Sequence, residues 1–272
     1  MRNIKKFQKT IWDFYTTHKR DFPWRNTKDP YKIWVSEVML QQTQTDRVVP
    51  KYRLFLKRFP SVQKLASARQ QEVLELWQGL GYNRRGLNLK RGAEAIVERF
   101  NGKIPKDPDL LETLPGIGPY TAKAIITFAY NMPLVFIETN IRTVYLDYFF
   151  KNKSAKVHDK DILCLVEKTI DTVNPREWFY ALMDYGVMLK KVHKANNIKS
   201  VHYRKQTPFK GSSREVRSAI LKHIVSNGPT TYSTLCTIEV VKNKKNILHK
   251  KLEELVREGF IVKNNNYYSL VN

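Results

Sequence analysis

A loop at residues 113–125, TLPGIGPYTAKAI, combines residue types that can hold a phosphate. Gly116 and Gly118 allow backbone N–H groups to approach an anion closely, and the N-terminus of a following helix favours negative charge. Pro119 suits the first position of that helix, and Thr121 can reach a free amide or a phosphate. A helix connection without any ligand has the same glycine pattern, so the loop taken alone leaves that alternative open.

Glu37, in the stretch VSEVML, is the second feature that could do chemistry. Its neighbours Val35, Val38, Met39 and Leu40 are apolar. A carboxyl group in such surroundings has a raised pKa, which a general acid needs near neutral pH. An isolated glutamate is more often a solvated helix residue, but the apolar flanks favour a buried acid.

The composition indicates a polyanionic partner. The chain has 48 Lys and Arg against 25 Asp and Glu, a net charge of +23 over 272 residues, with 12% aromatic residues. This balance is typical of nucleic-acid binding. No apolar run approaches the roughly 20 residues of a membrane span, and the N-terminal residues lack a signal-peptide pattern. We therefore expect a cytoplasmic, monomeric protein that does not bind membranes.

The cysteines and histidines argue against a metal centre. Cys164 and Cys236 are the only cysteines, and neither belongs to a CxxC pair. This excludes a disulfide framework, a four-thiolate zinc site and a cysteine-ligated iron-sulfur cluster. The six histidines show no metal-ligand spacing, so metal catalysis through protein side chains is not expected.

The elements that must position these residues are mostly helices. LASARQQEVLELWQGL and RRGLNLKRGAEAIVERF repeat apolar residues at three- and four-residue steps. A basic, poorly periodic stretch predicts a linker at 201–212. Beyond it, three helical patterns, the middle one TTYSTLCTIEV, precede two short strands in FIVKNNNYYSL. This order resembles a winged helix, although a helical packing or protein-interaction module at 213–272 is the alternative.

The glycine loop also resembles the helix-hairpin-helix element of base-excision DNA glycosylases. Three further motifs follow the order and spacing of adenine DNA glycosylases of the MutY type, over about residues 5–190. They are FPWRNTKDPYKIWVSEVMLQQTQTDRVVPKY from Phe22, LWQGLGYNRRGLNLK from Leu76 and VFIETNIRTV from Val135. The resemblance implies a mainly α, two-lobed helix-hairpin-helix glycosylase core with a small winged-helix-like α+β module. Residues 1–27 and 134–200 would form one lobe and 28–133 the six-helix lobe with the hairpin.

The resemblance implies that Glu37 protonates the base and later helps to activate water. A carboxylate must then stabilise the sugar cation near C1′. Glu138 occupies that position, two residues before Asn140, where the family has aspartate. The extra methylene leaves three outcomes open: Glu138 does the same work, the pocket takes another base, or activity is lost. Tyr120 replaces the lysine of bifunctional relatives, which predicts no Schiff base and no strand scission.

Base extrusion leaves a hole in the duplex, which inserted side chains fill. The resemblance assigns that insertion to Gln42 and Tyr82, with Gln41 as an alternative. The remaining site residues expected from it are Trp24 and Arg25 in the base pocket, and Arg84, Gly116, Gly118, Thr121 and Lys123 on DNA. A monovalent cation on the hairpin carbonyls is a further implied ligand.

Two features of the family are missing from this sequence. Lys190 stands where the first of four cluster cysteines would be, so we expect no iron-sulfur cluster. The domain that recognises 8-oxoguanine is replaced by the C-terminal module. The resemblance therefore favours removal of adenine opposite G or 8-oxoguanine from double-stranded DNA. A thymine or uracil glycosylase acting on G mispairs is the alternative enzyme, and a non-catalytic DNA-binding or regulatory protein is the alternative of another class.

Overall fold

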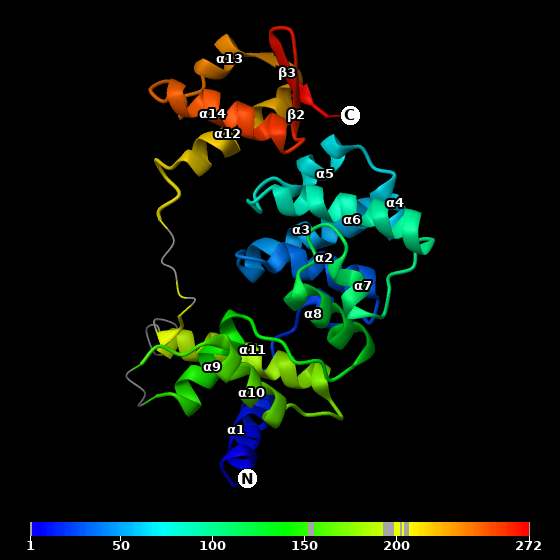
Figure 1. Cartoon of the computed structure of the whole chain (residues 1–272), viewed down its shortest axis with the longest axis vertical. Coiled ribbons are helices and arrows are strands. Elements are labelled where there is room, and N and C mark those ends of the chain that lie inside the picture. Colours follow the sequence, from blue (N-terminus) through cyan, green and yellow to red (C-terminus); the bar gives the residue numbers. More distant parts are fainter. Residues whose placement is uncertain (1, 152–154, 193–198, 202, 204–206, 272) are drawn as a thin grey trace. The chain divides into compact units, whose positions relative to one another are not determined.

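The computed structural model describes residues 2–151, 155–192, 199–201, 203 and 207–271 (Figure 1). The chain forms two compact units. The first unit comprises Met1–Val38 and Lys103–Arg204, and the second comprises Met39–Gly102 and Lys205–Asn272. The lobe limits at 28–133 and 134–200 stay a prediction, and the predicted linker at 201–212 falls partly outside the described residues.

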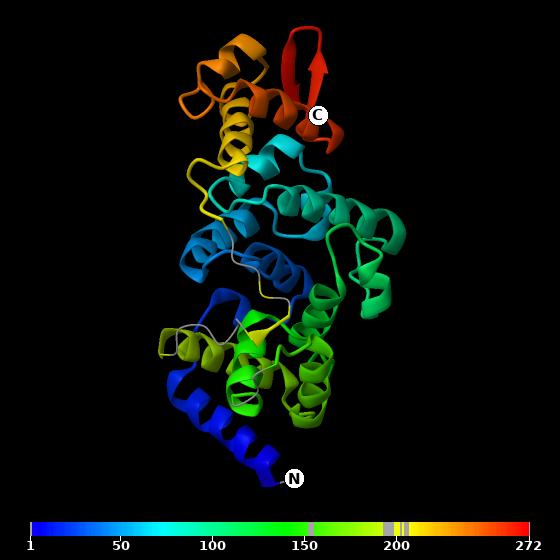
Figure 2. The ribbon, with the colours of Figure 1, turned by 60° about the vertical axis from the view of Figure 1, so that its left-hand side comes forward.

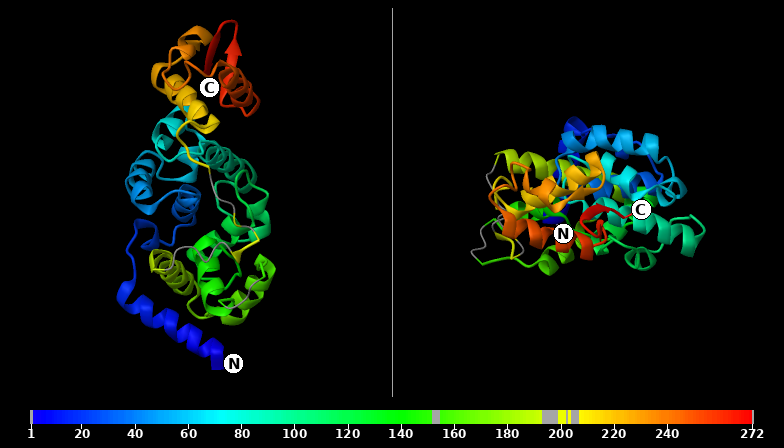
Figure 3. Two further views of the ribbon diagram at one scale, coloured as in Figure 1. Left: turned by 90° about the vertical axis from the view of Figure 1, so that its left-hand side faces the viewer. Right: turned by 90° about the horizontal axis from the view of Figure 1, so that it is seen from above.

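The first unit consists of helices packed around a core rich in aromatic residues. Helices α1 and α9 both pack on the long helix α11, and α10 packs on α9 (Figures 1 and 3). Phe7 of α1, Tyr145 of α9 and Trp178 of α11 are fully buried, because each of these three helices turns its aromatic residue toward the shared core. The elements are α1 (Arg2–His18), η1 (Pro23–Arg25), α2 (Pro30–Leu40), α7 (Pro108–Glu112), α8 (Pro119–Tyr130), α9 (Thr139–Phe149), α10 (Asp159–Thr169) and α11 (Pro175–Val192).

The hairpin between α7 and α8 follows from four residues of its loop. Leu114 and Ile117 are buried and fix the loop to the unit. Gly116 has a φ of 79°, a left-handed conformation that glycine adopts without strain. Pro119 is the first residue of α8, as the sequence predicts, where its missing N–H costs nothing.

The second unit combines four helices of the core with the whole C-terminal module. Its core helices are α3 (Thr45–Arg58), α4 (Val62–Ala66), α5 (Gln70–Trp77) and α6 (Arg84–Phe100). The predicted helix RRGLNLKRGAEAIVERF coincides with α6. Gly86 lets α6 approach α5 closely, since a Cβ there would lie 2.7 Å from the Trp77 ring.

The C-terminal module is the predicted small α+β unit. It contains α12 (Ser213–Asn227), β1 (Thr230–Thr231), α13 (Tyr232–Cys236), α14 (Lys245–Arg257), β2 (Ile261–Asn264) and β3 (Tyr267–Leu270) (Figure 2). The sheet is antiparallel in the order β1-β3-β2, with Asn265 at a φ of 52° in the β2–β3 turn. The helix predicted over TTYSTLCTIEV was wrong at both ends, because Thr230 and Thr231 pair with β3 and the helix runs only from Tyr232 to Cys236.

The module shares its core with helices α5 and α6. Leu74 of α5 and Leu87 of α6 are each 2% exposed and belong to the same apolar cluster as Ile220, Leu252 and Phe260. The side-chain amide of Gln70 donates to the Phe260 carbonyl at 3.0 Å. The module is therefore packed onto the core part of its own unit. No helix of the described ranges is both long and apolar enough to cross a membrane.

Candidate functional site

Glu37 is a buried acid in hydrogen-bond contact with Tyr120. It lies in α2 with 6% of its surface exposed, next to the buried residues Val35, Val38 and Met39. The Tyr120 hydroxyl donates to Glu37 Oε2 at 2.7 Å. The pKa of Glu37 is raised to about 7: burial is the largest cause, the hydrogen bond from Tyr120 lowers the pKa, and the charge of Glu138 raises it. A carboxyl with this pKa is protonated in a large fraction of molecules at neutral pH.

Tyr120 is a neutral donor in this pair. Burial raises its pKa well above the ordinary value of 10, and the charge of Glu37 acts in the same direction. Its ring packs edge-on against Phe136, with centroids 5.6 Å apart, so the hydroxyl is held toward the acid. The sequence predicts Tyr120 only as a replacement for lysine, and its contact with Glu37 requires the fold.

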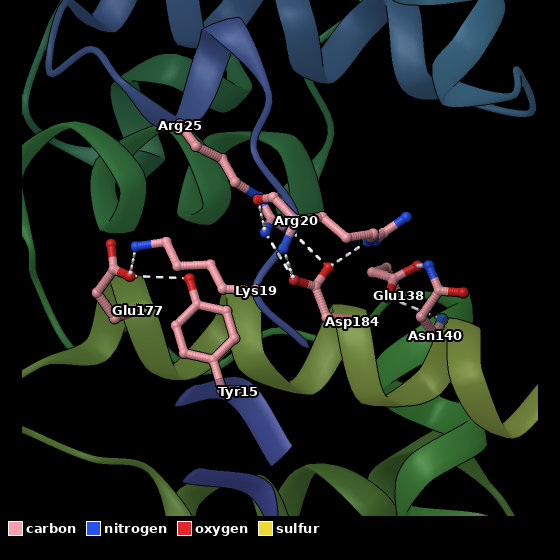
Figure 4. A network of polar contacts seen from close by, with 8 residues as sticks. All are labelled: Tyr15, Lys19, Arg20, Arg25, Glu138, Asn140, Glu177 and Asp184. Atoms are coloured by element: carbon pink, nitrogen blue, oxygen red, sulfur yellow. Dashed lines mark hydrogen bonds and ion pairs between the residues drawn. The ribbon is translucent and has the colours of Figure 1, made fainter. Parts of the chain in front are cut away.

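Glu138 is the N-cap of α9. Its Oε1 accepts from the backbone N–H groups of Asn140 at 2.7 Å and Ile141 at 2.9 Å. Figure 4 shows Glu138 beside Asn140. Its Oε2 accepts from the Asn140 side-chain amide at 3.1 Å. Three donors and the helix N-terminus thus hold a carboxylate in one orientation. The longer glutamate side chain folds back onto its own helix, as an N-cap aspartate does.

Asp184 of α11 binds two arginines of the segment before α2 (Figure 4). The Arg25 guanidinium pairs with both carboxylate oxygens at 2.8 Å, and Arg20 Nε lies 2.6 Å from Oδ1. Arg25 is 4% exposed at its side chain and lies over the Tyr180 ring at 4.5 Å. Trp24 is 4% exposed and stacks on Phe22. The base-pocket roles of Trp24 and Arg25 stay predictions, whereas Asp184 is a structural centre that the sequence analysis missed.

The hairpin presents backbone rather than side chains. Gly116 and Gly118 are exposed, and a Cβ at Gly118 would meet no atom within 4 Å. An approaching phosphate therefore meets free space at the N-terminus of α8. Thr121 is 3% exposed and Lys123 is partly buried, so neither side chain lies open on the surface.

The two residues predicted to insert into the duplex, Gln42 and Tyr82, are exposed and have a left-handed backbone. Gln42 has a φ of 55° and Tyr82 a φ of 46°. Non-glycine residues in this region are strained, and such strain occurs where the surroundings hold a functional loop in place. Tyr82 is 43% exposed. Gln41, the alternative insertion residue, is partly buried.

Arg85 connects these two strained turns. Its guanidinium donates to the Met39 carbonyl at 3.0 Å and the Thr43 hydroxyl at 3.0 Å on one side. On the other side it donates to the carbonyls of Leu80 at 3.1 Å and Gly81 at 3.2 Å. Arg85 thus binds the backbone around both predicted insertion residues.

Arg84, predicted to contact DNA, forms an ion pair with the module. Its Nη2 lies 2.6 Å from Glu258 Oε1, and 61% of its side chain is still exposed. Arg217 of α12 pairs with the same carboxylate at 2.6 Å. Within the described part of the chain, no group of three or more His, Cys, Asp or Glu residues could hold a metal ion. The absence of a cluster and the hairpin cation stay predictions.

Comparison with known proteins assigns the chain to a family. The family model of the HhH-GPD superfamily base excision DNA repair protein matches residues 35–168. The thymine/uracil-DNA glycosylase of Pyrobaculum aerophilum is 33% identical over 187 residues, covering 66% of this chain and 81% of that protein. The chain belongs to the HhH-GPD superfamily.

Other HhH-GPD relatives are longer than this chain. The adenine DNA glycosylase of Buchnera aphidicola subsp. Baizongia pistaciae is 37% identical over 188 residues, which cover 67% of this chain and 52% of that protein. The human adenine DNA glycosylase is 34% identical, with 36% of its length covered. The chain thus matches about half or less of these relatives. The structure of a thermostable thymine-DNA glycosylase superposes with a TM-score of 0.63 at 25% identity, covering 74% of this chain and 93% of that one.

Proposed function

We propose that this chain is a DNA N-glycosylase that removes a mispaired base from double-stranded DNA. The observation that carries the proposal is the buried Glu37 acid, with a pKa of about 7 and the Tyr120 hydroxyl 2.7 Å from its Oε2. A protein that only binds DNA has no use for a buried acid, which costs stability. The net charge of +23 supplies the attraction to DNA.

The chemistry divides between two carboxyl groups. Glu37, with Oε2 occupied by Tyr120, carries its proton on Oε1 and transfers it to a ring nitrogen of the base. The bond between C1′ and the base breaks, and its electron pair leaves with the base. The Glu138 carboxylate stabilises the positive sugar. Water then adds its oxygen to C1′ and returns a proton to Glu37.

The first candidate substrate is adenine opposite G or 8-oxoguanine. The similarity to adenine DNA glycosylases across 67% of this chain supports it. Thymine or uracil opposite G is the second candidate. It is supported by the 33% identity to the thymine/uracil-DNA glycosylase over 187 residues. In both cases Tyr120 predicts a product with an intact strand, since a phenol forms no Schiff base.

The test is single-turnover excision on duplexes that carry A, T, U or C opposite G and opposite 8-oxoguanine. Strand cleavage is read before and after alkali. We expect cleavage at one class of mispair, visible only after alkali. Cleavage before alkali would contradict the monofunctional mechanism.

Glu37→Gln is the matched control, because it keeps the shape of the side chain and removes its acid. We expect loss of excision with duplex affinity retained. Excision at the wild-type rate by this variant would overturn the proposal. Binding without excision on every duplex by the wild type would support a DNA-binding protein instead.

A further inference from the structure

Lys190 contacts the carboxylate system that the proposed function uses. It lies in the last turn of α11, and its Nζ donates to Asn140 Oδ1 at 2.7 Å. The side chain is partly buried rather than extended into water. A lysine at a helix C-terminus is favourable for the helix dipole alone, but that role would leave the ammonium in solvent.

The contact decides which way the Asn140 amide faces. A lysine ammonium has three donors and no acceptor, so it accepts only the oxygen of the amide as its partner. The NH₂ group must then face the other way, and it donates to Glu138 Oε2 at 3.1 Å. A flipped amide would place an oxygen against the Glu138 carboxylate.

The packing of α11 on α9 fixes the distance over which Lys190 acts. A Cβ at Gly186 would lie 2.3 Å from the Asn140 carbonyl oxygen, so the two helices touch at their backbones. Lys190 is one helical turn beyond Gly186 on the same helix. The close packing of α11 on α9 therefore places Lys190 near Asn140.

Charge also connects Lys190 with Glu138. Burial lowers the pKa of Lys190, the charge of Glu138 raises it, and that of Arg142 lowers it. Arg142 is itself paired with Asp159 at 2.7 Å. The Lys190 ammonium and the Glu138 carboxylate therefore attract each other.

We infer that Lys190 is a positioning residue, which orients the Asn140 amide so that it holds the Glu138 carboxylate for its work at C1′. The inference rests on the proposed function. Lys190 touches no reacting atom and acts through Asn140.

The test compares Lys190→Met, which keeps length but cannot donate, with Lys190→Arg, which can. Lys191→Met, the exposed neighbour, is the control. We expect the single-turnover rate of Lys190→Met to fall on the order of 10- to 100-fold, with duplex affinity unchanged. Lys190→Arg should recover most of the rate, and melting temperatures exclude loss of fold.

A double-mutant cycle separates positioning from general stability. In an Asn140→Ala background, Lys190→Met should cost much less, because the hydrogen-bonded route through the Asn140 amide is already removed and only the attraction between the charges of Lys190 and Glu138 is left. Equal losses in both backgrounds would overturn the inference. A wild-type rate in Lys190→Met, with Glu37→Gln inactive, would also overturn the inference. That outcome would leave the proposed function intact.

The amide orientation has a readout without any activity. The side-chain NH₂ signals of Asn140, identified by their loss in Asn140→Ala, should shift in Lys190→Met and not in Lys191→Met. An unchanged Asn140 signal would contradict the orientation. If the wild-type protein removes no base, the proposed function is wrong. The Asn140 NH₂ signals in Lys190→Met then still test whether Lys190 contacts Asn140.

Discussion

At the scale of the residue, the Glu37 carboxyl loses its contact with water on folding, and this raises its pKa from the ordinary 4.5 to about 7. Only protonated Glu37 can donate the proton that starts excision. The rate should therefore fall as the pH rises through about 7 and approach a tenfold loss per pH unit. A pH profile of single-turnover excision checks this expectation, and a flat profile from pH 6 to 9 would contradict it.

The same shift has a consequence for stability. Between pH 4.5 and 7 the unfolded chain releases the Glu37 proton while the folded chain keeps it, so folding stability falls across this window. Glu37→Gln should thus stabilise the protein at pH 8, by up to about 3 kcal/mol, and change little at pH 4.5. Thermal melts at both pH values measure this, with the exposed Glu98→Gln on α6 as the control.

Local sequence predicts some of these residues and not others. The burial of Glu37 follows from its apolar neighbours, and the N-cap position of Glu138 from the helix that begins after it. The contact of Tyr120 with Glu37 joins residues 83 positions apart, and that of Lys190 with Asn140 joins residues 50 apart. Only the packing of α2, α8, α9 and α11 brings these pairs together, and no local pattern contains that information.

At the scale of the element, Arg85 holds two turns of the second unit in strained conformations. The planar guanidinium donates to carbonyls of both turns. A lysine ammonium has fewer donors, and they are not arranged to reach both turns at once. Arg85→Lys should leave partly buried carbonyls of these turns without partners, at a cost of about 1–3 kcal/mol. We expect a lower melting temperature and weaker unstacking of 2-aminopurine placed at the target site in duplex DNA.

Arg47→Lys, on an exposed turn of α3, is the control for Arg85→Lys. If both variants melt and unstack DNA like the wild type, Arg85 does not support the turns.

Hydrophobic periodicity and helix-breaking residues predicted α6 and the β2–β3 hairpin correctly. They did not predict β1, because a two-residue strand has no period and exists only by pairing with β3.

At the scale of the whole molecule, Glu258 connects the C-terminal module to α6. Its carboxylate is 16% exposed and binds Arg84 and Arg217, each at 2.6 Å. Glu258→Gln removes the charge that both arginines share, so the module should loosen. We expect faster amide hydrogen exchange in α12 and α14. Glu239→Gln, 86% exposed in the same module, is the control and should exchange like the wild type.

The sharing of Leu74 and Leu87 between the core helices and the module also bears on how such a gene can change. A premature stop codon after residue 212 would remove the module and leave both leucines facing water, so the shortened product would be prone to aggregation. A domain on a free tether can be lost or exchanged in one genetic event. Loss of this module would instead expose Leu74 and Leu87, which ties its inheritance to that of the core.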